Sequence, residues 1–119
     1  MMIPLAPMIV SAHEARLVLS TAGSREEAET IAESLVDLGL AACVNLVTGV
    51  TSIYRWQESI ERADEILLMI KTTESRLAEL EAALRKLHSY EVPELLVLSL
   101  ESGGQDYLAW LAASTTEEK

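Results

Sequence analysis

Three short runs of consecutive apolar residues constrain the fold of this chain more than any other feature of its sequence. They span residues 17–19, 66–70 and 95–98, and turn-forming or polar residues bound each of them. A strand with one solvated face alternates apolar and polar residues, whereas a strand covered on both faces is continuously apolar. The runs therefore predict a sheet that is buried on both of its faces.

Helical patterns lie between these strands. After a strand at residues 15–21, Ser24 is a good N-cap for a helix whose apolar residues recur at helical spacing until Gly39. Residues 41–57 are rich in strand-forming side chains, and Gly49 within them suggests a bulge. This segment and the strand at residues 66–72 predict a hairpin. Ser75 is the expected N-cap of a second helix, and a short helix is expected over residues 105–113.

The predicted order is β-α-β-β-α-β with a terminal helix, which is the ferredoxin-like arrangement of the α+β class, with an antiparallel sheet. Its two long helices cover only one face of the sheet. The other face must be covered by another part of the structure. A second copy of the chain supplies more surface for this than the terminal helix and the N-terminal segment do. We expect a flexible extension at residues 1–13, one domain at residues 14–113, and a polar tail at residues 114–119.

The amino-acid composition limits the classes of partner that this chain is expected to bind. Half of the 119 residues are apolar, which is enough for one globular domain. Nineteen acidic and nine basic residues give a net charge of −10, which disfavours nucleic acids and anionic membranes. Cys43 is the single cysteine, so no internal disulfide forms, and a reducing compartment, the cytoplasm, is expected. The apolar residues 1–10 lack the basic start of a signal peptide.

Few residues are candidates for chemistry. The thiol of Cys43 and the imidazole of His88 are donors for soft metals, with a buried core thiol and a helix-terminal histidine as the alternative explanations. Lys71 ends an apolar strand, where its charge needs a carboxylate or a ligand beside it. Glu91 is the candidate for that carboxylate. Tight metal sites require three or four ligands, and no Cys/His pair in this sequence has the spacing typical of metal ligands. Nucleophile-elbow, Walker, GxGxxG, HExxH and paired-carboxylate signatures are absent.

Four segments together resemble the CutA family in order and spacing. They are LAACVNLVTGVTSIYRW (40–56), EILLMIKT (65–72), HSYEVPEL (88–95) and YLAWL (107–111). The resemblance implies a tight trimer and a link to tolerance of divalent metals such as copper. It also implies similarity to the trimeric PII signalling proteins. In the family, residues equivalent to Tyr54, Trp56, Lys71 and Glu91 help to line clefts between subunits, and Cys43 and Tyr90 are further candidates for such a cleft here.

The copper-associated members of that family carry a cysteine on the first strand and two consecutive histidines after the second helix. The corresponding residues here are Ser20 and Leu87-His88, so we expect weak copper binding, through His88. The predicted function is a cytoplasmic, non-enzymatic homotrimer that responds to metal ions by binding or regulation. The alternatives are a PII-like protein that binds a nucleotide or small ligand, a structural trimeric scaffold, and an enzyme using Lys71, His88 and Glu91 across an interface.

Overall fold

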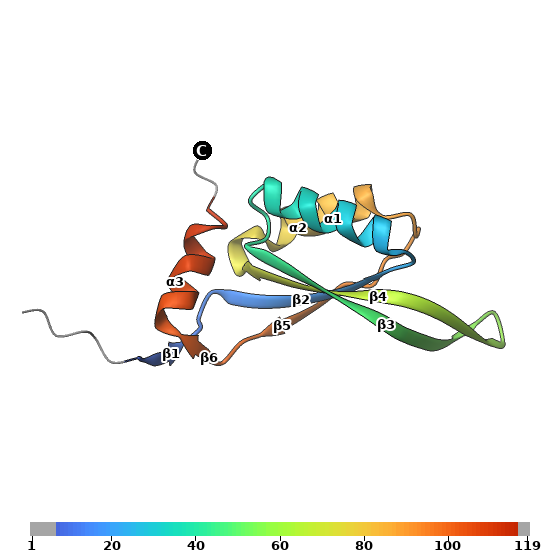
Figure 1. Cartoon of the computed structure of the whole chain (residues 1–119), viewed down its shortest axis with the longest axis horizontal. Helices are drawn as coiled ribbons and strands as arrows, with labels where there is room; N and C mark the ends of the chain where they lie inside the picture. Colours follow the sequence, from blue (N-terminus) through green and yellow to red (C-terminus); the bar gives the residue numbers. More distant parts are fainter. Residues whose placement is uncertain (1–6, 117–119) are drawn as a thin grey trace, which may run out of the picture.

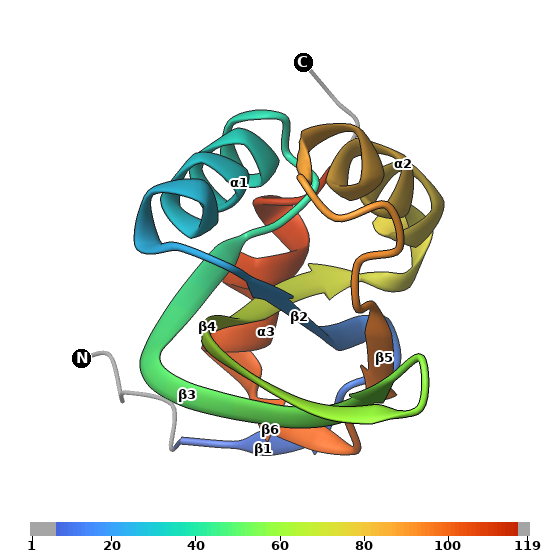
Figure 2. The same cartoon turned by 90° about the vertical axis from the view of Figure 1, so that its right-hand side faces the viewer.

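The computed structural model describes residues 7–116, in which a four-stranded antiparallel sheet has the order β3-β4-β2-β5. Its strands are β2 (Ala15–Ala22), β3 (Cys43–Trp56), β4 (Ser59–Thr73) and β5 (Leu96–Ser99). Helices α1 (Arg25–Asp37) and α2 (Leu77–Leu87) lie side by side on one face of this sheet (Figures 1 and 2). The α+β class and the antiparallel ferredoxin-like order expected from the sequence are confirmed.

Local signals explain where α1 begins and ends. The Ser24 hydroxyl accepts a hydrogen bond from the backbone N–H of Glu27 at 3.1 Å, which satisfies one of the free donors of the first turn. At the other end Gly39 has a φ of +73°, a left-handed conformation that glycine adopts without strain. The predicted cap of α2 was wrong, because Ser75 lies inside a 3₁₀ turn (Glu74–Arg76) that precedes the helix.

The main core lies between these two helices and the sheet. Val18 of β2 pairs with Ile70 of β4, and both side chains are fully buried on the helix side. Other fully buried members of the same cluster are Ile31, Leu35, Leu68, Leu80 and Leu84. We call this side of the sheet the helix face.

A third layer covers one end of the opposite face. It consists of α3 (Gln105–Ala113) and a small sheet of β1 (Ile9–Ser11) and β6 (Ser102–Gly104) (Figure 1). A second apolar cluster forms there, from Ala12, Ala15, Ala42 and Leu111.

The structure differs here from the expected flexible extension at residues 1–13, because β1 pairs with β6 and Ala12 is buried. A three-residue strand is too short to show a periodic pattern in the sequence. Residues 1–6 of that extension and residues 117–119 of the expected polar tail lie outside the described residues.

The rest of that opposite face is apolar and uncovered within the chain. The registers of β2, β4 and β5 place Leu17 beside Leu98, and Leu19 beside both Leu96 and Met69. Leu96 is 55% exposed and Leu98 is 42% exposed, although both lie in strands with an apolar sequence. We call this surface the open-face patch, and it consists of Leu17, Leu19, Val47, Leu67, Met69, Leu96 and Leu98.

Strands β3 and β4 continue beyond the sheet as a two-stranded ribbon, which we call the hairpin arm (residues 50–65; Figure 1). A register shift between Val47 and Val50, with Gly49 at a φ of +78°, separates the arm from the sheet. At its tip Gln57 and Glu58 both have positive φ, as in a type I′ turn. The hairpin and the bulge were predicted, but β4 begins at Ser59, seven residues before the expected strand.

Candidate functional site

The residues singled out in the sequence lie at three separate places within one chain. Cys43 and Lys71 are register partners on β3 and β4 near α3. The second place is the loop after α2, which carries His88, Tyr90 and Glu91. The third is the hairpin arm, where the side chains of Tyr54 and Trp56 are exposed, and Trp56 is opposite Ser59 near the tip.

His88 follows the last residue of α2, and its side chain is fully buried. Its Nε2 lies 2.6 Å from the carbonyl oxygen of Thr21, and its Nδ1 lies 3.0 Å from the backbone nitrogen of Tyr90. Because a carbonyl only accepts and an amide N–H only donates, these contacts require the neutral tautomer with its hydrogen on Nε2. A metal ion on either nitrogen has to displace one of these hydrogen bonds.

Glu27, in the first turn of α1, fixes the same loop. Its Oε2 accepts a hydrogen bond from the backbone N–H of Ser89 at 2.7 Å and lies 3.7 Å from His88 Nδ1. Burial raises the pKa of Glu27, but the hydrogen bonds that Ser89 donates, together with smaller contributions from His88 and the backbone of Gly23, outweigh this, so the pKa lies below its usual value. The carboxylate is therefore ionised at neutral pH and joins the start of α1 to the loop.

A second carboxylate joins this loop to the base of the hairpin arm. Glu65 is buried, and its two oxygens accept hydrogen bonds from the hydroxyl of Tyr90 at 2.8 Å and of Ser52 at 2.6 Å. Burial, together with the hydrogen bond to Glu65 and its charge, raises the pKa of Tyr90 to about 12. A Cβ atom at Gly23 would lie 3.1 Å from the Tyr90 hydroxyl, so the small residue there leaves room for it.

Lys71 is half-buried and contacts an aromatic ring. Its Nζ lies 5.6 Å from the ring centroid of Tyr107 on α3, within the range of a cation–π interaction. Tyr107 in turn packs on Trp110, with ring centroids 5.5 Å apart. Tyr107 and Trp110 belong to a segment that resembles the family but were not predicted as site residues, and their spacing of three on a helix was the available signal.

The structure does not bring Glu91 to Lys71 within the chain. Tyr90, the neighbour of Glu91, contacts Glu65, which precedes Lys71 by six residues on β4. Six strand residues span about 20 Å, which is too far for an ion pair. Glu91 is exposed, so it remains available to another molecule.

Cys43 has a partly exposed thiol, and its Sγ lies 3.9 Å from the side-chain oxygen of Asn45. Among residues 7–116 there is no group of three or more His, Cys, Asp or Glu side chains placed to hold a metal ion. None of the helices described is long and apolar enough to cross a membrane.

Residues 16–114 match the model of the CutA1 divalent ion tolerance protein family. The chain belongs to this family. A curated relative, the divalent-cation tolerance protein CutA of Thermus thermophilus, is 46% identical over 99 residues, which cover 83% of this chain and 96% of that protein. The chloroplastic protein CutA of Arabidopsis thaliana is 40% identical over 99 residues, covering 83% of this chain and 54% of that protein. The resemblance seen in the sequence is thereby confirmed.

Solved CutA structures share the fold. The structure of CutA from Synechococcus elongatus PCC7942 matches with a TM-score of 0.88 at 36% identity, covering 92% of this chain and 96% of that one. The same CutA complexed with a Bis-Tris molecule matches with a TM-score of 0.84, covering 90% and 99% of the two chains. The CutA match spans the sheet, α1, α2 and α3, and therefore every place described above.

Proposed function

We propose that this chain acts in tolerance of divalent metal ions, as a cytoplasmic homotrimer that binds its ligand in clefts between subunits and carries out no catalysis. The open-face patch is the observation that carries the proposal. Monomeric proteins rarely leave a broad apolar patch in water, because burying it is favourable by roughly 25 cal/mol for each Å². The names of the relatives supply the link to divalent cations.

A second copy of the chain is the occupant that suits this patch. The seven side chains of the patch are uncharged, although the chain as a whole carries a net charge of −10. Two copies in contact through it bury apolar surface and leave their acidic residues at the edges. The hairpin arm supports the same conclusion, since an isolated two-stranded ribbon is marginally stable in water and needs a surface to pack on. The family resemblance specifies three copies.

Assembly also explains how separated residues form one site. Trp56, which is 60% exposed at the end of the arm, and the exposed Glu91 are both accessible to another subunit. Lys71 supplies a cation and Tyr107 an aromatic face at the other end of β4. We infer that a cleft between subunits joins the Lys71 end of one chain to Glu91 and the arm of another.

Two ligand classes fit such a cleft. Divalent metals suit the acidic chain and the family name, with His88 as a weak copper ligand once one of its two hydrogen bonds is displaced. A small organic ligand is the second candidate, supported by the Synechococcus relative that was solved with Bis-Tris. Lys71 beside Tyr107 is the group we expect an anionic or hydroxylated ligand to contact.

Light scattering tests the assembly. The mass expected is three times 13.0 kDa, without a monomer at micromolar concentration. A monomeric chain with the same circular dichroism spectrum would contradict the trimer and, with it, the shared cleft.

Calorimetric titration tests the ligand. Copper(II), zinc(II) and Bis-Tris are titrated separately into the trimer and into the Lys71→Met and His88→Asn variants. Loss of copper binding only in His88→Asn supports the metal assignment, and loss of Bis-Tris binding only in Lys71→Met supports the cleft. Tight copper binding that survives in both variants would contradict the proposed ligand.

A further inference from the structure

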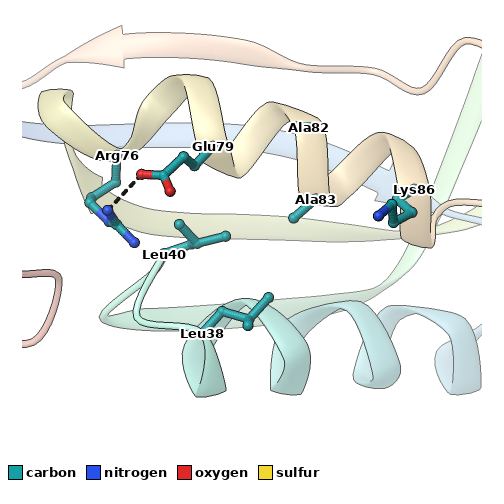
Figure 3. Close-up of a pocket in the computed structure, with 7 residues that line it drawn as sticks. All are labelled: Leu38, Leu40, Arg76, Glu79, Ala82, Ala83 and Lys86. Atoms are coloured by element: carbon teal, nitrogen blue, oxygen red, sulfur yellow. Dashed lines mark hydrogen bonds and ion pairs between the residues drawn. The ribbon is translucent and has the colours of Figure 1, made fainter. Parts of the chain in front are cut away.

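A groove in the helix layer lies on the other side of the sheet from the open-face patch. It runs between the end of α1 and the length of α2, and its volume is about 480 Å³ (Figure 3). A volume of this size is typical of a site for a small molecule, whereas a stable contact with another protein needs more than about 1,000 Å² of surface. Four aliphatic side chains line the groove: Leu38, Leu40, Ala82 and Ala83.

The apolar part of the groove is open to solvent. Leu38 is 50% exposed at the end of α1, and Ala82 is exposed on α2, whereas Leu40 is buried. The two alanine side chains on the α2 wall end at a methyl group, so they leave space that longer side chains would fill. An aliphatic molecule in this space removes apolar surface of both helices from water, which is favourable.

The two ends of the groove differ in charge. At one end Glu79 is paired with Arg76, with 2.6 Å between Oε1 and Nη1 (Figure 3). Lys86 lies at the other end, where it is exposed and forms no ion pair with the residues that the structure describes. An ammonium ion beside an apolar surface favours a ligand with an anionic head group and an aliphatic body.

The distance between the two ends limits the length of that ligand. Seven positions on α2 separate Glu79 from Lys86, which corresponds to about 10 Å along the helix axis, the length of an extended chain of about eight carbons. We propose that this groove is a second binding site, which takes a medium-chain carboxylate with its head group on Lys86 and its aliphatic chain along Leu38 and Ala83.

The net charge of the chain separates this site from non-specific binding. A protein with a net charge of −10 repels carboxylates at long range and attracts cationic amphiphiles. A preference for the carboxylate over a quaternary ammonium compound of equal chain length therefore requires a local cation at the head group. At an ionic strength of 0.15 M the Debye length is about 8 Å, so a direct contact with Lys86 outweighs the more distant acidic residues.

The first test is an NMR titration of the isotope-labelled, full-length protein with hexanoate, octanoate and dodecanoate below their micelle concentrations. We expect octanoate to bind with a dissociation constant on the order of 0.1–1 mM and to shift the amide signals of Leu38, Ala82 and Ala83. The affinity should rise about two- to fourfold for each carbon up to about eight carbons and then level off, because the groove ends there. A rise that continues to dodecanoate, or shifts confined to the open-face patch, would overturn the proposal.

The head group is tested with octanol, octyltrimethylammonium and Lys86→Gln. Octanoate should bind more tightly than both other compounds, and Lys86→Gln should weaken octanoate binding about two- to fivefold without changing octanol binding. Arg85→Gln is the matched control, since it removes the same charge from the neighbouring exposed position and should bind octanoate as the wild type does. Tighter binding of the cationic compound, or equal effects of the two substitutions, would contradict the role of Lys86.

The groove itself is tested with Ala82→Glu. The new carboxylate lies four positions before Lys86, where it pairs with the ammonium and repels the ligand, so octanoate binding should weaken by about tenfold or more. Ala78→Glu makes the same change at an exposed position of α2 outside the groove lining and should have no effect. Bis-Tris and copper(II) binding should be the same in Ala82→Glu as in the wild type, because the cleft between subunits is a separate site. Unchanged octanoate binding in Ala82→Glu would overturn the proposal.

Discussion

On the helix face of the sheet Leu68 and Ile70 are fully buried by α1 and α2, whereas on the opposite face Leu96 and Leu98 are 55% and 42% exposed. The side chains are of the same kind, and the strands that carry them, β4 and β5, both pair with β2 in one sheet. A continuous apolar run therefore tells us that both faces of a strand have to be covered, but not which part of the assembly covers each one. The helix face is completed by the chain itself, and for the open-face patch we propose another copy as the cover.

The largest effect is expected from Leu98→Asp in the open-face patch. If that patch is an interface, a carboxylate there is desolvated without a partner, at a cost of several kcal/mol in each of three subunits. We expect the trimer to dissociate while the circular dichroism spectrum keeps its helix and strand signals. Leu98→Met is the control that should remain trimeric. A trimer that tolerates Leu98→Asp would show that the patch is not the interface.

Leu84→Ala tests the helix face. It removes a fully buried side chain from the core and should lower the free energy of unfolding by about 2–5 kcal/mol. The exposed Val36→Ala on α1 should change it by less than about 0.5 kcal/mol. Urea unfolding at fixed protein concentration measures both. We expect Leu84→Ala to leave the mass of the folded assembly unchanged, in contrast to Leu98→Asp.

Tyr90→Phe tests whether the base of the hairpin arm is held by contacts within the chain. The change removes the hydroxyl that donates to Glu65 and leaves a buried carboxylate oxygen without this donor, at a cost of about 1–2 kcal/mol. Val92→Ala is a nearby control, because the side chain of Val92 is 78% exposed. An unchanged unfolding midpoint for Tyr90→Phe would show that the arm is positioned by other contacts.

The same phenol gives the wild-type protein an alkaline dependence. Folding raises the pKa of Tyr90 to about 12. The contribution of its protonated hydroxyl to the free energy of unfolding is therefore complete below the unfolded pKa near 10 and is lost as the pH rises through about 12. The unfolding midpoint of the wild type should fall over that interval relative to that of Tyr90→Phe.

The smallest effect is expected from Glu27→Gln, which probes the other end of the same loop. The pKa of Glu27 is lowered by folding, so its contribution is complete above the unfolded value and is lost as the pH falls through the folded value. Acid titration of stability should therefore be shallower in Glu27→Gln than in the wild type below about pH 5. Identical acid profiles of the wild type and Glu27→Gln would show that the Glu27 carboxylate does not stabilise this loop.

Most of the fold was predictable, because its signals are local. Ser24, Gly39 and Gly49 are capping or bulge positions that act through their own backbone or nearest neighbours. The start of β4 at Ser59 was missed because the hairpin arm lies beyond the sheet, where polar and apolar residues are equally exposed. Strand β1 was missed because it pairs with β6, which lies near the other end of the sequence. Ile9, for example, is opposite Gly104.

The candidate site was less predictable, because it depends on how elements dock. The contact between Lys71 and Tyr107 follows from the placement of α3 against the sheet, which no local pattern specifies. The separation of Lys71 from Glu91 follows from the path of the loop after α2. His88 was correctly placed after the helix, but one of its two hydrogen bonds is to the carbonyl oxygen of Thr21, far away in the sequence.

The extra residue in β3 sets a rule for how the hairpin arm can vary. Val47 is opposite Leu67 while Val50 is opposite Glu65, so three steps on one strand match two on the other. The side chains of β3 that share the side of the open-face patch therefore have odd numbers before the bulge and even numbers after it, which places Tyr54 and Trp56 on that side. Shortening or lengthening both strands of the arm by two residues preserves this orientation. Deleting Gly49 alone removes the extra residue and leaves Tyr54 opposite Glu61 on the same side, whereas inserting or deleting one residue of β3 beyond the bulge would turn the rings, so family members with arms of different lengths should differ there in matched pairs of residues.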